Sequence, residues 1–241
     1  MSADVTGRYA VRDVFLILLY CLIFDLFWIP VFYILLKPSL TDLRVIPISL
    51  IYASLFISFP LSIVLPYFVK RKYGMKIKDL GLNFSKFYAN LGFGLLGYIT
   101  AVTISILIIF VIATIVGYSD FFTSGTSAQR IIQLTLDTKS IVGTFVLIVL
   151  LCIYVPTVEE LYFRGFMYVS FRARVGIKTA SCISAFIFSV AHLDFAYFPY
   201  YFIVGIISNY LFEKRKSLIP SICLHSTNNL VAIVALSLGI S

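Results

Sequence analysis

Long apolar runs separated by short polar segments cover most of this chain. A helix that crosses a bilayer needs about 20 consecutive apolar residues. Runs of suitable length lie at about 12–36, 46–69, 87–117, 141–170, 179–197, 198–212 and 218–239. The pattern predicts an all-α fold, a polytopic transmembrane bundle of about seven spanning helices. We expect residues 1–241 to form a single integral membrane domain.

The composition supports this assignment. The chain is 61% hydrophobic and only 12% charged, whereas soluble domains carry about 25% charged residues. A soluble protein of this length could not cover its surface with so few charges. We therefore expect a protein of the lipid bilayer, most simply of the cell membrane.

The net charge of +8 has an explanation that does not involve nucleic acid. Cytoplasmic loops of membrane proteins carry an excess of Lys and Arg. Fourteen of the 19 basic residues fall before the first run, between the second and third, between the fourth and fifth, and between the sixth and seventh. Only Lys37, Arg44, Arg130 and Lys139 fall in the opposite loops. The asymmetry predicts a cytoplasmic N-terminus, an outside C-terminus and an odd number of spans.

One polar segment between the predicted spans has apolar residues at helical spacing. Residues 125–138 carry Ile131, Ile132, Leu134 and Leu136. The spacing is compatible with a short helix at the outer membrane interface. An ordered loop fits equally well.

The predicted fourth helix contains an unusual group of charged residues. Glu160 and Arg164 are four residues apart, so they share a helix face and can pair. Glu159 points about 100° away around the helix. A carboxylate without a paired cation can accept a proton, so Glu159 is the candidate general base. The structural alternative is an ion-pair network that fastens helices together.

The only two histidines of the chain lie in other apolar runs. His192 follows Phe188 by four residues, and His225 precedes Asn229 by four. Each pair therefore shares a helix face, so Phe188 can pack against the His192 ring. Asn229 can donate to a developing oxyanion or orient His225. Polar groups at membrane depth face the bundle interior and usually mark function.

The placement of these residues raises one difficulty. Straight helices would put His225 roughly 11 Å, and His192 roughly 21 Å, from the inner membrane edge. A shared site then needs tilted helices or a shorter fifth helix. Pro156 in the fourth helix also predicts a kink, with the carbonyl near Cys152 left without its helical donor.

Three motifs in order, Glu159-Glu160-x-x-x-Arg164, Phe188-x-x-x-His192 and His225-x-x-x-Asn229, resemble the CPBP intramembrane protease family. That family includes the type II CAAX prenyl endopeptidases and the bacterial Abi proteins of bacteriocin processing and immunity. The resemblance covers about 75 residues and places the motif-bearing catalytic half at about 141–239. Leu80-Gly81-Leu82 in the preceding basic loop is also similar to the family.

The resemblance implies an endopeptidase that hydrolyses a peptide bond in a membrane-associated peptide or protein tail. On the matching positions, Glu159 would activate water with the help of His192. His225 and Asn229 would stabilise the oxyanion, while Glu160 and Arg164 support the site. Members are commonly described as metalloproteases. Glu159, His192 and His225 could hold zinc and leave one coordination position open, although a metal-free general-base mechanism is slightly favoured.

Two other functions are compatible with the same residues. A non-catalytic membrane scaffold or bacteriocin-immunity protein could retain the pocket only to bind peptides. A proton-coupled transporter also uses intramembrane Glu and His. Against the transporter, the sequence shows no inverted repeat and no paired broken helices.

Overall fold

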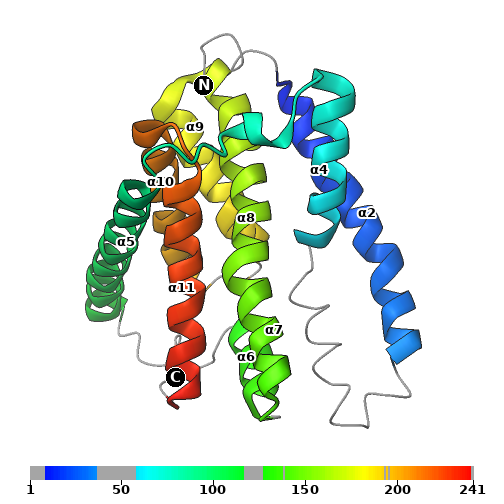
Figure 1. Ribbon diagram of the computed structural model, residues 1–241. Helices are drawn as coiled ribbons and strands as arrows, with labels where there is room; N and C mark the ends of the chain where they lie inside the picture. The colour runs from blue at the N-terminus through cyan, green and yellow to red at the C-terminus, as the bar shows by residue number, and fades with distance from the viewer. Residues whose placement is uncertain are drawn as a thin grey trace.

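Every regular element in the part of the chain that the structure describes is helical (Figure 1). The computed structural model describes residues 9–36, 58–116, 127–137, 139–192, 194 and 196–239. Within these ranges there is no strand, so the predicted all-α class is confirmed. The start of the predicted second run, 46–57, lies outside the described residues, as do Lys37 and Arg44.

A continuous helical column forms the centre of the molecule. It consists of α7 (Ile141–Val149), the π-helical turn η3 (Leu150–Tyr154), α8 (Val155–Glu160) and the π-helical η4 (Leu161–Tyr168). A π turn widens the helix and is frequently found at functional sites. Two such turns enclose the short α8, which carries the glutamate pair.

The column continues into α9 (Val169–Ala191), which changes direction at Gly176. Gly176 has φ 78° and ψ 172°, a backbone conformation that only glycine adopts readily. The predicted separation of the spans at 141–170 and 179–197 is confirmed, although the connection is this single break rather than a longer loop. The chain is helical on both sides of a single break. The segment after Gly176 is short, and His192 lies at its C-terminal cap.

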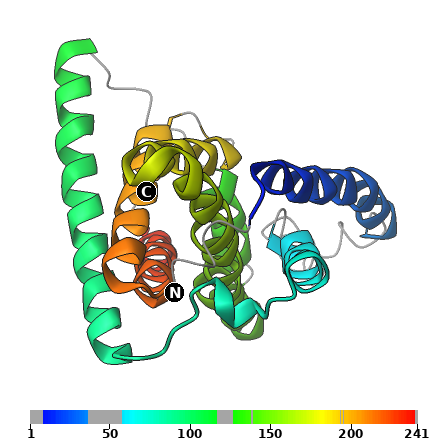
Figure 2. The same cartoon turned by 90° about the horizontal axis from the view of Figure 1, so that it is seen from above.

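The other long helices flank this column on two sides. They are α2 (Val11–Leu36), α4 (Ser58–Tyr73), α5 (Phe87–Val116), α10 (Phe198–Arg215) and α11 (Ile219–Ser237). Figure 2 shows the α2–α4 pair on one side of the column and α10 with α11 on the other. Helix α5 covers the outer side of α10 and α11. The column therefore contacts both groups of helices.

The basic segments of the chain gather at one end of this bundle. The end of α4, the 3₁₀ turn η2 (Ile77–Leu80), the start of α9 and the α10–α11 turn all lie at the top of Figure 1. The start of α7 and the C-terminus lie at the opposite end. This arrangement agrees with the predicted alternation of basic loops. That the basic end is cytoplasmic stays a prediction.

Three helical stretches among the described residues are long and apolar enough to cross a membrane. They are Phe87–Val111, Ile141–Ala191 and Ile219–Ser237. An integral membrane protein is therefore supported, whereas the predicted number of seven spans is not confirmed. Within the segment expected to be either an interfacial helix or an ordered loop, Ser127–Asp137 forms the helix α6.

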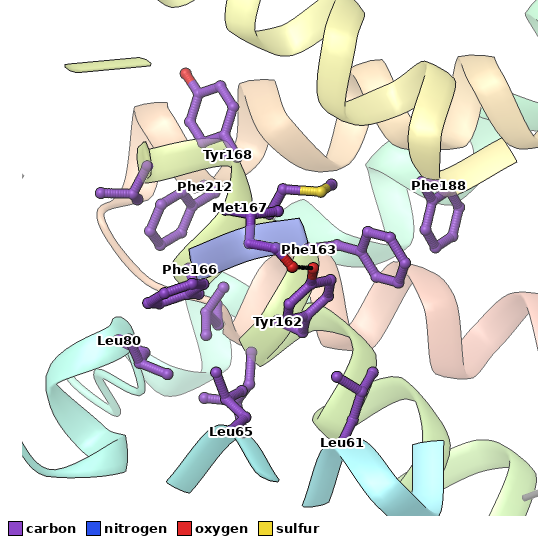
Figure 3. Close-up of a cluster of buried hydrophobic side chains, with 14 of the residues drawn as sticks. Leu61, Leu65, Leu80, Tyr162, Phe163, Phe166, Met167, Tyr168, Phe188 and Phe212 are labelled. Atoms are coloured by element: carbon purple, nitrogen blue, oxygen red, sulfur yellow. Dashed lines mark hydrogen bonds between the residues drawn. The ribbon is translucent and has the colours of Figure 1, made fainter. Parts of the chain in front are cut away.

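The core lies around η4, whose eight residues are all buried. Figure 3 shows Tyr162, Phe163, Phe166 and Met167 packed in this cluster, near Leu61 and Leu65 of α4. The Tyr162 hydroxyl donates to the backbone carbonyl of Val14 in α2 at 2.8 Å. A buried phenol needs such a partner. The bond attaches α2 to the column.

Gly165 permits a close approach between η4 and the loop that contains Leu80-Gly81-Leu82. A Cβ atom at Gly165 would lie 2.6 Å from the carbonyl oxygen of Leu80. Gly81, with φ 112°, accepts a hydrogen bond at its carbonyl from the Leu218 N–H at 2.9 Å. The loop is therefore fixed against both η4 and the start of α11.

A polar cluster at the basic end links α9 with α10. Glu213 forms ion pairs with Arg172 and Lys216 and accepts a hydrogen bond from the Tyr168 hydroxyl at 2.9 Å. Burial opposes ionisation of Glu213, but the donors from Lys216, Arg172 and Tyr168 outweigh it and lower the pKa of Glu213 below its ordinary value. The cluster stabilises the charged carboxylate.

Candidate active site

Glu160 is the buried anion at the centre of the candidate site. It is the last residue of α8, and its side chain is fully buried. Its Oε1 accepts a hydrogen bond from Arg164 Nη1 at 2.9 Å, which confirms the predicted pairing. The same oxygen lies 3.2 Å from His225 Nδ1 on α11. Glu160 therefore links the column to α11, a contact that helical spacing alone did not predict.

Arg164, in η4, is almost completely buried, with only 1% of its side chain exposed. Its guanidinium carbon lies 4.2 Å from the centroid of the Phe188 ring. A cation over an aromatic face is attracted by the ring quadrupole. Arg164 is thus held by a carboxylate on one side and by an aromatic ring on the other.

Phe188 also contacts both histidines. Its centroid lies 4.6 Å from that of His192 and 6.1 Å from that of His225, in edge-to-face geometry. The predicted apolar wall beside His192 is confirmed, and it serves His225 as well. The two imidazoles therefore share one neighbourhood. The helix after Gly176 ends at Ala191 rather than at the predicted 197, so it is shorter than predicted.

The orientation of the His192 ring is fixed by its own helix. Nδ1 lies 2.8 Å from the carbonyl oxygen of Phe188. A carbonyl can only accept, so Nδ1 carries the proton and Nε2 keeps a lone pair in the neutral ring. Tyr201 stacks on the same imidazole with centroids 4.0 Å apart and an interplanar angle of 23°. Sequence reasoning missed Tyr201.

Glu159 is surrounded differently from Glu160. It is only partly buried and forms no ion pair with any residue that the structure describes. Its Oε1 accepts a hydrogen bond from Ser58 Oγ on α4 at 2.8 Å. Glu159 lies close enough to His192 for the two groups to interact electrostatically. The predicted division between a paired Glu160 and an unpaired Glu159 is therefore present.

Asn229 contacts the column at its proline-containing turn. The N–H of Val155 bonds to the carbonyl of Leu150 in the π-helical register. In that register the Leu151 carbonyl would need the N–H of residue 156, which is proline and has none. Asn229 Nδ2 donates to this carbonyl at 2.7 Å. The carbonyl released by Pro156 is thus that of Leu151, which directly precedes Cys152 and agrees with the predicted position.

A second polar contact extends from Asn229 to α10. Asn228 Nδ2 donates to Asn229 Oδ1 at 3.3 Å, and the Tyr200 hydroxyl donates to Asn228 Oδ1. An amide nitrogen has two N–H groups. One N–H of Asn229 donates to Leu151, and the other has no acceptor among the residues that the structure describes.

The predicted zinc ligands do not form a metal site as they are placed. Among the described residues, no group of three or more His, Cys, Asp or Glu side chains is arranged to hold a metal ion. His225 directs Nδ1 to Glu160, His192 directs Nδ1 to Phe188, and Glu159 is bonded to Ser58. These contacts use only Nδ1 of each ring and Oε1 of Glu159, so Nε2 of both histidines and Oε2 of Glu159 stay open to a reacting water or to a metal ion.

Comparison with known protein families gives a match to the segment that carries most of this site. The family model "Type II CAAX prenyl endopeptidase Rce1-like" matches residues 141–231. The predicted family resemblance is confirmed for this segment. It contains Glu159, His192, His225 and Asn229, whereas Ser58 lies outside it.

One curated relative also matches part of the chain. It is the UPF0177 protein YxdF of Lactococcus lactis subsp. lactis (strain IL1403), 34% identical over 82 residues. The match covers 34% of this chain and 45% of the relative, so the chain spans less than half of that protein's length. No solved structure gives a significant match.

Proposed function

We propose that this chain is an intramembrane endopeptidase that hydrolyses a peptide bond in a membrane-associated peptide or protein tail. The family match over 141–231 carries this proposal. It is supported by the contacts within that segment, which bring both histidines to Phe188 and both motif glutamates to one helical turn. The proposed location is the cell membrane, with the N-terminus in the cytoplasm.

Glu159 is the proposed general base. Ser58 occupies Oε1, so Oε2 is the oxygen that accepts a proton from the attacking water. His192 assists at Nε2, the nitrogen that keeps a lone pair because Nδ1 donates to Phe188. The hydroxide formed in this way attacks the scissile carbonyl carbon. The proton held by Glu159 then passes to the leaving amine as the C–N bond breaks.

His225 and Asn229 are the proposed oxyanion-stabilising residues. An imidazolium at His225 would have its Nδ1–H on the Glu160 carboxylate and its Nε2–H directed to the developing oxyanion. Asn229 contributes the N–H that Leu151 does not use. Arg164 and Phe188 keep Glu160 and the two rings in place. Each group thus has a role that its contacts allow.

A peptide-cleavage screen of the full chain in liposomes tests this proposal. The probes are internally quenched peptides with prenylated Cys-aliphatic-aliphatic-X tails, and a matched set of unprenylated peptides. We expect cleavage by the unmodified chain, with and without EDTA, and no cleavage by the Glu159→Gln variant. Equal cleavage by both proteins would contradict the proposal. Binding without cleavage would favour the peptide-binding scaffold, and loss of activity with EDTA would favour a metal.

A further inference from the structure

Helix α4 contacts the site-bearing column through two serines. Ser58 Oγ donates to Glu159 Oε1, and Ser62 Oγ accepts from the Tyr154 hydroxyl, each at 2.8 Å. The two serines are four residues apart, so they share the face of α4 that lies against η3 and α8. Only one of these contacts involves a residue of the proposed reaction.

The Ser58 contact differs from those of other hydroxyls in the apolar helices. Several of these hydroxyls donate to the carbonyl four residues earlier in their own helix, which satisfies a polar group at membrane depth locally. Those with this bond are Thr100, Thr103, Thr114, Thr157, Ser170 and Ser189. Ser58 instead donates a hydrogen bond to the carboxylate of Glu159 on another helix. Ser58 is only 2% exposed.

The hydrogen bond makes the two oxygens of Glu159 unequal. A hydrogen bond to an ionised acceptor is about twice as strong as a neutral one, and a low-dielectric surrounding strengthens it further. Ser58 therefore fixes the rotation of the carboxylate and leaves Oε2 for other partners. Glu159 has no cationic partner among the described residues. The bond from Ser58 is therefore the one hydrogen bond of its carboxylate within that part of the chain.

We propose that Ser58 is a positioning residue for Glu159, which holds the carboxylate so that Oε2 faces the attacking water. This inference rests on the proposed protease function. It also extends the site beyond the family-matched segment 141–231, because α4 supplies the positioning hydroxyl. The N-terminal helices then take part in the reaction as well as in anchoring the fold.

Steady-state cleavage of a prenylated quenched peptide tests the role of the hydroxyl. We expect Ser58→Ala to lower kcat by about tenfold, the scale of one hydrogen bond to a charged group, with KM within about twofold. Ser58→Thr, which retains a hydroxyl, should recover most of the loss, and Ser58→Cys should recover little. Ser62→Ala is the matched control, because it removes the Tyr154 contact but not the Glu159 contact. Equal kcat losses in Ser58→Ala and Ser62→Ala, or no rescue by threonine, would overturn the proposal.

An infrared measurement separates this inference from the proposed function. The carboxylate bands of Glu159 are obtained as the difference between the unmodified chain and Glu159→Gln, without any substrate. We expect Ser58→Ala to shift the antisymmetric carboxylate stretch, while Ser62→Ala leaves it in place. An unshifted band in Ser58→Ala overturns the inference even if peptides are cleaved. If the band shifts but no peptide is cleaved, the Ser58–Glu159 contact is supported. The protease function is then refuted, and the positioning role of Ser58 is refuted with it.

Discussion

Glu160 Oε1 lies 3.2 Å from His225 Nδ1 and also accepts from Arg164 Nη1, so one buried oxygen joins η4 to α11. This bond sets the position of α11 relative to the column. Because Glu159 is the neighbouring residue, the same contact determines where His225 lies relative to the proposed base. A side chain outside the proposed chemistry therefore aligns two residues within it.

The two glutamates should respond differently to the same substitution. Glu159→Gln removes the proposed base, and we expect kcat to fall by about 10²–10⁴-fold with little change in stability. Glu160→Gln leaves Arg164 buried without its anion, so we expect it to destabilise the fold by about 3–5 kcal/mol. Peptide cleavage and thermal unfolding in detergent measure the two effects. A stable but inactive Glu160→Gln beside an active Glu159→Gln would reverse the assigned roles.

Asn229 should contribute to stability as well as to catalysis. In Asn229→Ala the Leu151 carbonyl loses its donor, which costs about 1–3 kcal/mol for a buried polar group. Pro156→Ala returns an N–H to the turn that lacks one. We therefore expect the double variant to regain part of the lost stability but none of the lost activity. Recovery of cleavage in the double variant would show that Asn229 acts only through Leu151.

Tyr201 should keep the His192 ring in position through its aromatic face. Tyr201→Phe preserves the stacked ring, so we expect cleavage within about twofold of the unmodified chain. Tyr201→Leu removes the stack, worth about 0.5–1.5 kcal/mol for an aromatic pair, and should lower kcat by roughly 3–10-fold. The comparison of kcat for the two variants decides the point. A large loss in Tyr201→Phe would assign the role to the hydroxyl instead.

Glu213 should make the fold more sensitive to acid. Its pKa is lowered in the folded state by Lys216, Arg172 and Tyr168 despite burial. A lowered folded-state pKa contributes stability that is present above the unfolded-state pKa, about 4.3, and is lost as the pH falls through the folded-state value. This titration falls approximately between pH 5 and pH 3. Over that range we expect the thermal unfolding midpoint of Glu213→Gln to fall less than that of the unmodified chain. Parallel profiles would contradict this assignment.

The orientation in the membrane can be tested at two exposed lysines. Lys139 precedes α7, and Lys216 lies in the α10–α11 turn at the other end of the bundle. In a cysteine-free background, we expect an impermeant thiol reagent to label Lys139→Cys in intact cells and to label Lys216→Cys only after lysis. Labelling of Lys216→Cys alone in intact cells would invert the predicted topology.

Helical spacing and hydropathy determined the features that depend on residues near one another in the sequence. The all-α class follows from the apolar runs, since a bilayer leaves backbone groups no water to bond with. The Glu160–Arg164 pair and the Phe188–His192 contact follow from the four-residue repeat of a helix. The same motifs in their order were sufficient to predict the resemblance to the family whose model matches 141–231.

Contacts between helices were decided only by the tertiary structure. Ser58 lies 101 residues before Glu159, and no local period connects them. The stack of Tyr201 on His192 and the bond from Asn229 to Leu151 likewise depend on how the helices are placed. The π turns around α8 and the break at Gly176 shift the register that an ideal helix would give. Packing across the bundle therefore selects which polar groups meet, because lipid offers buried side chains no other partner.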